Sequence, residues 1–124
     1  MNHQLALIVE DDQDVARISA EALAAAGFET EIVRDGAAAL ARLAVTRPAL
    51  VLLDLNLPGV HGTEVLRQIR ADARLAGVQV VVATGVSLAR AELEDKADFI
   101  LIKPVSYDQL HQLAARLIIK AATG

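Results

Sequence analysis

Asp54 follows an unbroken apolar run, residues 50–53, and the chain turns shortly afterwards at Pro58-Gly59. An apolar run of this length, bounded by prolines, is typical of a strand that is buried on both faces. The side chain that ends such a strand lies in the crevice outside the carboxyl ends of the sheet, where ligands bind in open α/β folds. A partly desolvated carboxylate there suits a nucleophile or a metal ligand. The alternative interpretation is an aspartate that caps the following turn.

Three further stretches place polar side chains directly after an apolar run. They are Glu10-Asp11-Asp12, Thr84-Gly85 and Lys103-Pro104. Each stretch by itself has an ordinary interpretation, as a solvated helix start, a turn or a strand terminator. Because all of them fall at the same end of different predicted strands, as Asp54 does, we expect their side chains to meet in one pocket.

The apolar pattern predicts strands that alternate with helices along the whole chain. Strands are expected at residues 5–9, 28–33, 50–54, 78–83 and 99–102, and helical spacing at 15–26, 37–44, 65–69, 88–94 and 110–121. Asp12 is well placed as the N-cap of the first helix, and Gly27 as its stop. Strand–helix order repeated five times predicts an α/β protein with a flavodoxin-like (βα)5 doubly wound parallel sheet, strand order 2-1-3-4-5.

Composition limits the function classes further. A chain of 124 residues fits one domain, 1–124, and a net charge of −4 argues against direct binding of nucleic acid. The absence of cysteine excludes disulfides and thiolate sites. No apolar run is long enough to cross a bilayer and the N-terminus has no signal-peptide pattern, so we expect a cytoplasmic chain without membrane insertion.

Several carboxylates in one crevice repel one another unless a cation neutralises them. Oxygen ligands without histidine or cysteine favour a hard ion, and Mg²⁺ is the natural choice. We expect Asp11 and Asp12 to hold the metal and Asp54 to be the attacking carboxylate. Lys103 adds a positive charge and Thr84 a hydroxyl donor. A nucleophile, neutralised charge and positioning groups are the requirements of phosphoryl transfer.

These motifs together resemble the receiver domain of two-component response regulators, the CheY-like family, over the whole chain. The matching residues are Asp11-Asp12, Asp54 with the loop to Gly62, Thr84 and Lys103-Pro104. The resemblance implies that Asp54 accepts a phosphoryl group from a phosphohistidine and that Asn56 offers its backbone carbonyl to Mg²⁺, so that the metal ligands are Asp11, Asp12, Asp54 and Asn56. It also implies that Thr84 and Lys103 contact the phosphoryl oxygens, and that the Lys103-Pro104 bond is cis.

The sequence departs from the family pattern in two places. Ile100 stands where family members usually carry an aromatic residue, and alternation puts Phe99 on the opposite face of the strand. The stretch between Thr84 and Lys103 is short for the family, which predicts a truncated or irregular fourth helix. Short segments of this kind resemble receivers attached to hybrid histidine kinases.

The leading hypothesis is a phosphoacceptor domain in a phosphorelay, which catalyses its own aspartyl phosphorylation and dephosphorylation but acts mainly as a switch. Its expected partners are a sensor histidine kinase or histidine phosphotransfer domain, docking at the crevice and the first helix, and a downstream effector. One alternative is a Mg²⁺-dependent phosphohydrolase, although Asn56 stands where such enzymes place a second acid. The other is a phosphorylation-independent interaction domain. His61 is interpreted as a solvated loop residue, and the arginines at 67, 70 and 74 as a solvated stripe.

Overall fold

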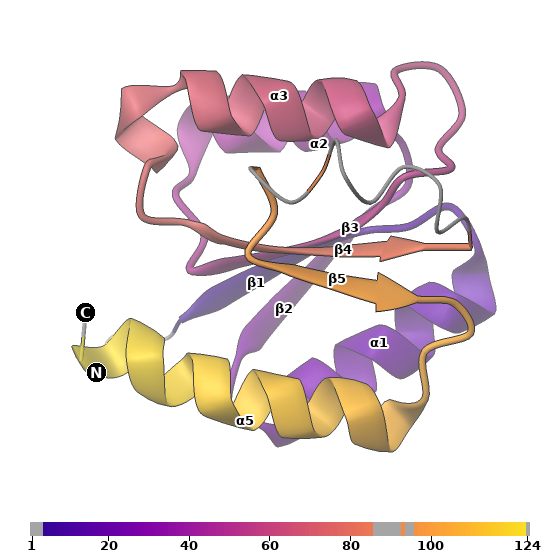
Figure 1. Ribbon diagram of the computed structural model, residues 1–124, viewed down its shortest axis with the longest axis vertical. Coiled ribbons are helices and arrows are strands. Elements are labelled where there is room, and N and C mark those ends of the chain that lie inside the picture. The colour runs from indigo at the N-terminus through magenta and orange to yellow at the C-terminus, as the bar shows by residue number, and fades with distance from the viewer. Residues whose placement is uncertain (1–3, 86–92, 94–95, 124) are drawn as a thin grey trace.

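The computed structural model describes residues 4–85, 93 and 96–123, and these form one parallel sheet between two layers of helices (Figure 1). The strands lie in the order β2-β1-β3-β4-β5, which confirms the predicted order 2-1-3-4-5. Their bounds are Leu5–Val9 (β1), Glu29–Val33 (β2), Leu50–Asp54 (β3), Gln79–Thr84 (β4) and Phe99–Ile102 (β5).

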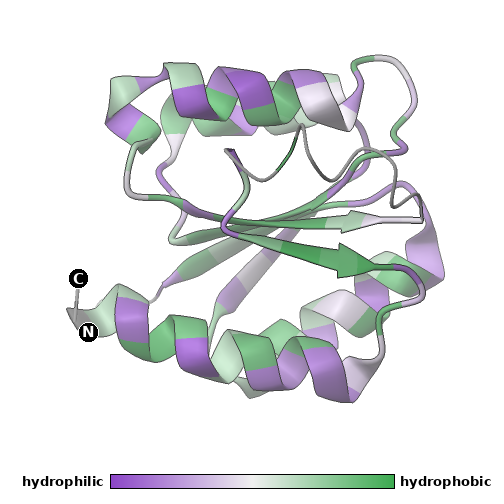
Figure 2. Ribbon diagram, viewed as in Figure 1, coloured by the Kyte–Doolittle hydropathy of each residue, from purple (hydrophilic) through white to green (hydrophobic). Residues whose placement is uncertain are grey.

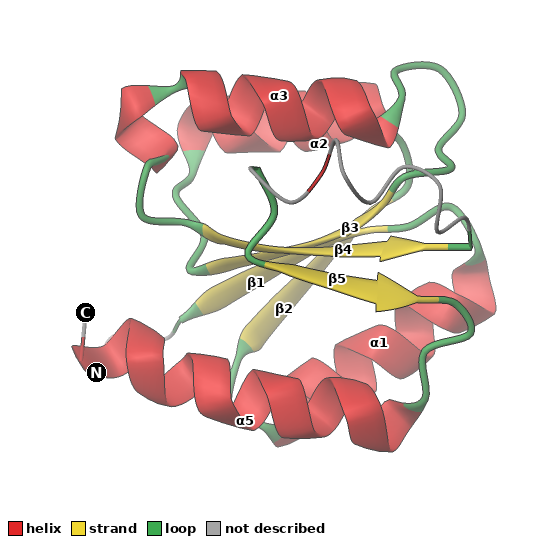
Figure 3. Ribbon diagram, in the orientation of Figure 1, coloured by secondary structure: helices red, strands yellow, loops and turns green. Residues whose placement is uncertain are grey.

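Helices cover both faces of the sheet (Figure 3). The pair α1 (Gln13–Ala25) and α5 (Tyr107–Thr123) lies on one face, and α2 (Gly36–Val45) and α3 (Gly62–Ala71) lie on the other. A short 3₁₀ helix, Ala73–Leu75, follows α3 and was not predicted. Most of the helix predicted at 88–94 lies outside the described residues. None of the helices in the described ranges combines the length and the apolar character needed to cross a membrane.

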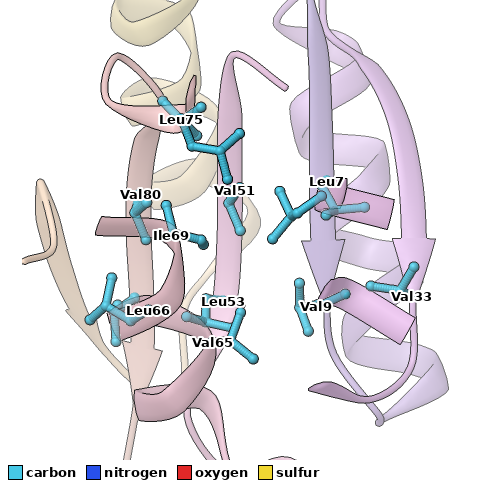
Figure 4. Close-up of a cluster of buried hydrophobic side chains, with 14 of the residues drawn as sticks. Leu7, Val9, Val33, Val51, Leu53, Val65, Leu66, Ile69, Leu75 and Val80 are labelled. Carbon is cyan, nitrogen blue, oxygen red and sulfur yellow. The ribbon is translucent and has the colours of Figure 1, made fainter. Parts of the chain in front are cut away.

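The sheet separates two apolar cores, and its central strand belongs to both. All five residues of β3 are buried. Val51 and Leu53 pack toward α2 and α3, where Figure 4 shows them against Ile69 and Val65. Leu50 and Leu52 face the opposite core, on the side of α1 and α5. In Figure 2, β5 is green along its length whereas the helices alternate between green and purple, as expected of helices with one apolar face.

Two aspartates begin helices at the edge of the sheet where the strands end. The Asp12 carboxylate accepts the backbone N–H groups of Asp14 and Val15, and so confirms the predicted N-cap of α1. Asp35 accepts the N–H of Ala38 in the same way at the start of α2. At the other end of α1, Gly27 has a φ of +111°, a left-handed conformation that favours glycine after a helix.

The register of the sheet brings the strand ends to one edge. Val9 pairs with Leu53, Asp54 pairs with Ala83, and Thr84 pairs with Ile102. Because all five strands run in the same direction, the residues that follow them gather at this edge. The fold therefore collects groups that are separated by up to 93 positions along the chain, the spacing between Glu10 and Lys103.

Candidate functional site

Asp54 is the last residue of the most buried strand, and its side chain is only 4 % exposed. Its two carboxylate oxygens have different partners. Oδ1 accepts the backbone N–H of Asn56 at 3.0 Å, and Oδ2 lies 3.2 Å from Nζ of Lys103. The carboxylate is thus held in a fixed orientation at the end of the strand by one backbone hydrogen bond and one charge-assisted contact.

Lys103 joins two carboxylates at the edge of the sheet. Its Nζ also lies 3.2 Å from Oε1 of Glu10, the residue that directly follows β1. Partial burial by itself would lower the pKa of Lys103, but the charges of Glu10 and Asp54 outweigh it and raise the pKa above the ordinary value. The lysine therefore carries a full positive charge inside the acidic pocket. The peptide bond from Lys103 to Pro104 is cis, as the resemblance implied.

Glu10 lies inside the site, although the sequence pattern assigned the metal to Asp11 and Asp12 and gave Glu10 no role of its own. Its backbone N–H continues the sheet by donating to the carbonyl of Val33, and the residue is only 5 % exposed. Burial raises the pKa of this carboxyl group, the N–H of Asp12 opposes the shift, and the nearby charge of Asp54 adds to it. Because burial disfavours the ionised form of Glu10 in the free protein, a bound cation would stabilise that form.

The acidic group differs from the predicted one by a single position. Carboxylate oxygens of Glu10, Asp11 and Asp54 lie within 4.8 Å of one another. Asp12 is not part of this group, because its carboxylate is occupied at the start of α1. The N-cap role of Asp12 was itself visible in the sequence. A side chain that caps a helix points back at the helix, so this signal already favoured Glu10 and Asp11 as the pair that faces Asp54.

Asp11 is the exposed member of the group. Its backbone carbonyl accepts a hydrogen bond of 2.9 Å from Nη2 of Arg34, which ties the loop after β1 to the end of β2. Its carboxylate is left at the mouth of the pocket, whereas those of Glu10 and Asp54 are buried. Three carboxylates of mixed exposure, all of them hard oxygen donors, suit Mg²⁺ with some of its water retained.

Thr84 closes the opposite side of the site. It is the last residue of β4, it is buried, and its carbonyl accepts the N–H of Lys103 at 2.8 Å. A cavity of about 520 Å³ opens between the loops that follow β3, β4 and β5. It is lined by Asp54, Leu55, Asn56, His61, Thr63, Thr84, Gly85 and Lys103. The predicted residues Asp54, Asn56, Thr84 and Lys103 thus surround one space.

The loop after Asp54 is packed tightly against the strand that it leaves. A Cβ at Gly62 would lie 2.6 Å from the backbone oxygen of Asp54 and 2.6 Å from Cα of Leu55. The N–H of Gly62 donates to the carbonyl of Leu55 at 3.3 Å. Only a glycine allows this approach, so the start of α3 is fixed beside the carboxylate.

Ile100 and its neighbours follow the predicted alternation. Ile100 packs against the core on the α2 and α3 side, and Leu101 packs against the core on the α1 and α5 side. Phe99, on the same side as Leu101, is 37 % exposed. The strand therefore presents an aliphatic side chain at the position that the family usually gives to an aromatic residue. The segment in which the truncated fourth helix was predicted is largely outside the described residues.

A doubly wound parallel sheet with three carboxylates, a threonine and a lysine at its carboxyl edge defines a class of aspartate-centred phosphoryl sites. The sequence matches the family model of the response regulator receiver domain over residues 6–115. The chain belongs to this family, and it is a receiver domain of two-component signalling.

Known relatives agree with this assignment. The DNA-binding response regulator MtrA of Mycolicibacterium paratuberculosis is 37 % identical over 107 residues, which are 86 % of this chain and 48 % of MtrA. The chain therefore spans about half the length of this relative. A CheY-like receiver domain from Methylobacillus flagellatus has a TM-score of 0.81 at 30 % identity, covering 94 % of this chain and 99 % of that one. The phosphorylated cyanobacterial phytochrome response regulator RcpA has a TM-score of 0.80 at 33 % identity, covering 94 % and 91 %.

Proposed function

We propose that Asp54 accepts a phosphoryl group from a phosphohistidine on a partner protein and that the phosphorylated state changes partner binding. The observation that carries the proposal is the contact of 3.2 Å between Asp54 Oδ2 and Lys103 Nζ in a pocket that also holds Thr84. A buried carboxylate with an ordered partner on each oxygen is a positioned nucleophile.

The transfer forms a bond between phosphorus and a carboxylate oxygen of Asp54 while the bond from phosphorus to the donor imidazole nitrogen breaks. The electron pair of the broken bond returns to the imidazole. Lys103 is placed to contact a phosphoryl oxygen after the reaction, and Thr84 lines the cavity in which the other oxygens would lie. Such groups act by positioning and by stabilising the charge of the transferred group.

Glu10, Asp11 and Asp54, together with the backbone carbonyl of Asn56, are the residues that would hold Mg²⁺. The ion would neutralise the carboxylates and the incoming phosphoryl oxygens. Asp12 remains in the proposal as the cap of α1, where it fixes the direction in which the loop after β1 leaves the sheet.

The donor is expected to dock over α1 and the loop after β5. Val15 and Ile18 of α1 are 40 % and 43 % exposed, which makes an apolar strip beside the site. A cavity of about 320 Å³ begins at Asp54 and Lys103 and extends beneath this strip to Val105. A sensor histidine kinase or a histidine phosphotransfer domain would present an apolar helix face here, and we place this exchange in the cytoplasm. A downstream effector would recognise the phosphorylated form.

The direct test is incubation with acetyl phosphate and Mg²⁺ followed by intact mass measurement. The wild-type chain should gain one phosphate, and Asp54→Asn should gain none. Asp72→Asn is a matched control, because Asp72 lies after α3 at the opposite end of the sheet. A wild-type chain that stays unmodified while Mg²⁺ binds would contradict the proposal.

The two other hypotheses make different predictions in the same experiment. A phosphohydrolase would release many equivalents of phosphate from phosphomonoesters, whereas a switch is modified once per molecule. An interaction domain that does not need phosphorylation would bind its partner equally well after Asp54→Asn.

A further inference from the structure

We propose that His61 is the general base that removes the phosphoryl group from Asp54, so that this receiver sets the lifetime of its own signal. The inference rests on the proposed phosphorylation of Asp54. Its basis is the position of His61 in the wall of the cavity that also contains Asp54, Thr84 and Lys103.

The backbone fixes His61 at the corner where the loop after β3 enters α3. On one side, a Cβ at Gly36 would lie 2.3 Å from the carbonyl oxygen of Val60, which shows how closely the loop packs on α2. On the other side, Gly62 is pressed against the backbone of Asp54 and Leu55. The imidazole therefore projects from a corner whose position relative to the acceptor carboxylate is set by backbone packing.

The side chain of His61 is not used to stabilise the helix that it precedes. His61 occupies the N-cap position of α3 and makes no side-chain hydrogen bond to the helix. Asp12 and Asp35 occupy the same position in α1 and α2, and both accept backbone N–H groups. Histidine is not among the residues that cap helices well. An exposed imidazole without a capping role remains able to bind a water molecule and accept its proton.

The other side chains that line this cavity do not offer a base. Among the described lining residues, the only ionisable groups apart from His61 are Asp54 and Lys103. Asp54 carries the phosphoryl group in the reaction, and Lys103 is a cation held between Asp54 and Glu10. Asn56 and the two threonines lack a group that accepts a proton at neutral pH.

The proposed step is hydrolysis of the acyl phosphate. A water oxygen attacks phosphorus from the side opposite Asp54, and His61 takes one proton of that water. The bond between phosphorus and the Asp54 oxygen breaks, and its electron pair restores the aspartate carboxylate. The products are inorganic phosphate and a protonated imidazole, which then releases its proton to solvent. No oxidant, reductant or further reactant is needed.

The rate of this step should depend on the imidazole of His61, because only a ring nitrogen that carries no proton can accept one from the attacking water. Among the residues that the structure describes, the charged groups that bear on it are Asp54 and Lys103 across the cavity, and Glu64 and Arg67 on the first turns of α3, which are paired with each other. Asp35 at the start of α2 is the further charge near the packed loop.

The test measures the loss of phosphate after phosphorylation with acetyl phosphate and removal of the donor, in constant Mg²⁺. Relative to wild type, His61→Gln should slow the first-order decay by about a hundredfold or more, the lower end of the usual contribution of a general base. The decay of His61→Gln should also depend less on pH than the decay of wild type does, because the variant lacks the general base. Added imidazole should restore part of the rate in His61→Ala but not in His61→Gln, where the side chain fills the space. His111→Gln, a histidine of α5 stacked on Tyr107, is the matched control and should decay as wild type does.

The outcomes separate this inference from the proposed function. If the wild-type chain gains no phosphate, the phosphoacceptor proposal fails, and the role of His61 fails with it. If wild type and His61→Gln gain one phosphate equally but decay at the same rate with the same pH profile, only the role of His61 is overturned. Equal initial phosphorylation also shows that the variant has kept its folded site.

Discussion

The backbone N–H of Asp12 donates a hydrogen bond of 3.1 Å to Oε2 of Glu10, two residues earlier. This bond turns the Glu10 side chain back into the pocket, where Oε1 reaches Lys103. At the same point the Asp12 side chain turns away to begin α1. Three consecutive acidic residues are thereby divided between two tasks. Glu10 and Asp11 face Asp54, and Asp12 stabilises a helix.

Substitutions at Asp11 and Asp12 should separate these tasks. Asp12→Ala should lower the free energy of unfolding by about 1 kcal/mol, because α1 loses its cap, and should leave Mg²⁺ affinity close to that of wild type. Asp11→Ala should weaken Mg²⁺ binding by at least about tenfold with little loss of stability. Urea unfolding and calorimetric Mg²⁺ titration measure the two effects. Equal loss of Mg²⁺ affinity in both variants would contradict this division and show that Asp12 also binds the metal.

The raised pKa of Glu10 predicts a pH-dependent stability in the absence of divalent ions. Because the folded protein holds the proton of this group more tightly than the unfolded chain does, its contribution is complete below the ordinary value of 4.5 and is lost as the pH rises through the folded pKa. Glu10→Gln keeps the neutral form, so its stability should exceed that of wild type at pH 7 and converge with it below pH 4.5.

Urea unfolding in EDTA at both pH values checks this prediction for Glu10. Glu21→Gln removes the same charge from an exposed position of α1 and serves as the control. A Glu10→Gln variant that is less stable than wild type at neutral pH would mean that the ion pair with Lys103 outweighs the cost of burial.

Lys103→Met should destabilise the fold in the absence of Mg²⁺ and much less in its presence. Without a divalent ion, Glu10 and Asp54 lose their shared cation, and unfolding should become easier by about 1–3 kcal/mol, less than for a fully buried pair because Lys103 is 30 % exposed. With millimolar Mg²⁺ the ion supplies the missing charge, and most of the loss should disappear. Thermal unfolding in EDTA and in Mg²⁺ tests this, and an equal deficit in both buffers would contradict it.

Gly62→Ala should destabilise the fold by about 1–3 kcal/mol, the usual cost of overpacking. The added methyl group would meet backbone atoms of Asp54 and Leu55, which cannot move aside without distorting the site. Gly85→Ala is the matched control, since a Cβ there has no atom within 4 Å. Denaturant midpoints of the two variants give the comparison. A Gly62→Ala protein as stable as Gly85→Ala would show that the loop has another arrangement available.

Arg70 should contribute more to stability than Arg67, although both lie on α3. The Arg70 guanidinium donates to the carbonyl of Val78 at 3.0 Å and to Oδ2 of Asp98 at 2.7 Å, and Asp98 in turn accepts the N–H of Val80. This network joins α3 to the beginnings of β4 and β5, so Arg70 is not part of a solvated stripe.

Arg70→Met should therefore cost about 1–2 kcal/mol. Arg67 makes an exposed pair with Glu64, so Arg67→Met should change stability much less than Arg70→Met does. Chemical unfolding of both variants under the same conditions decides the point. Equal costs would show that the Asp98 network adds nothing beyond a surface ion pair.

The sequence by itself determined the topology and most of the site. Unbroken apolar runs of four or five residues mark buried parallel strands, and in a parallel sheet the groups after those strands must share one edge. Asp54, Thr84 and Lys103 could be placed together for this reason alone. The edge position of β2 and the N-cap of α1 follow from equally local signals.

Tertiary structure alone decided how the Glu10 carboxylate is held and what the arginines do. The cap at Asp12 is a local signal, but the bonds that turn Glu10 toward Lys103 depend on the loop after β1 and on the distant end of β5. The partners of Arg70 and the wall position of His61 depend on side chains from distant segments, and no pattern along the chain encodes those distances. The pattern of strands determined which edge of the sheet carries the site. The packing of loops and helix ends determined which side-chain atoms face the pocket.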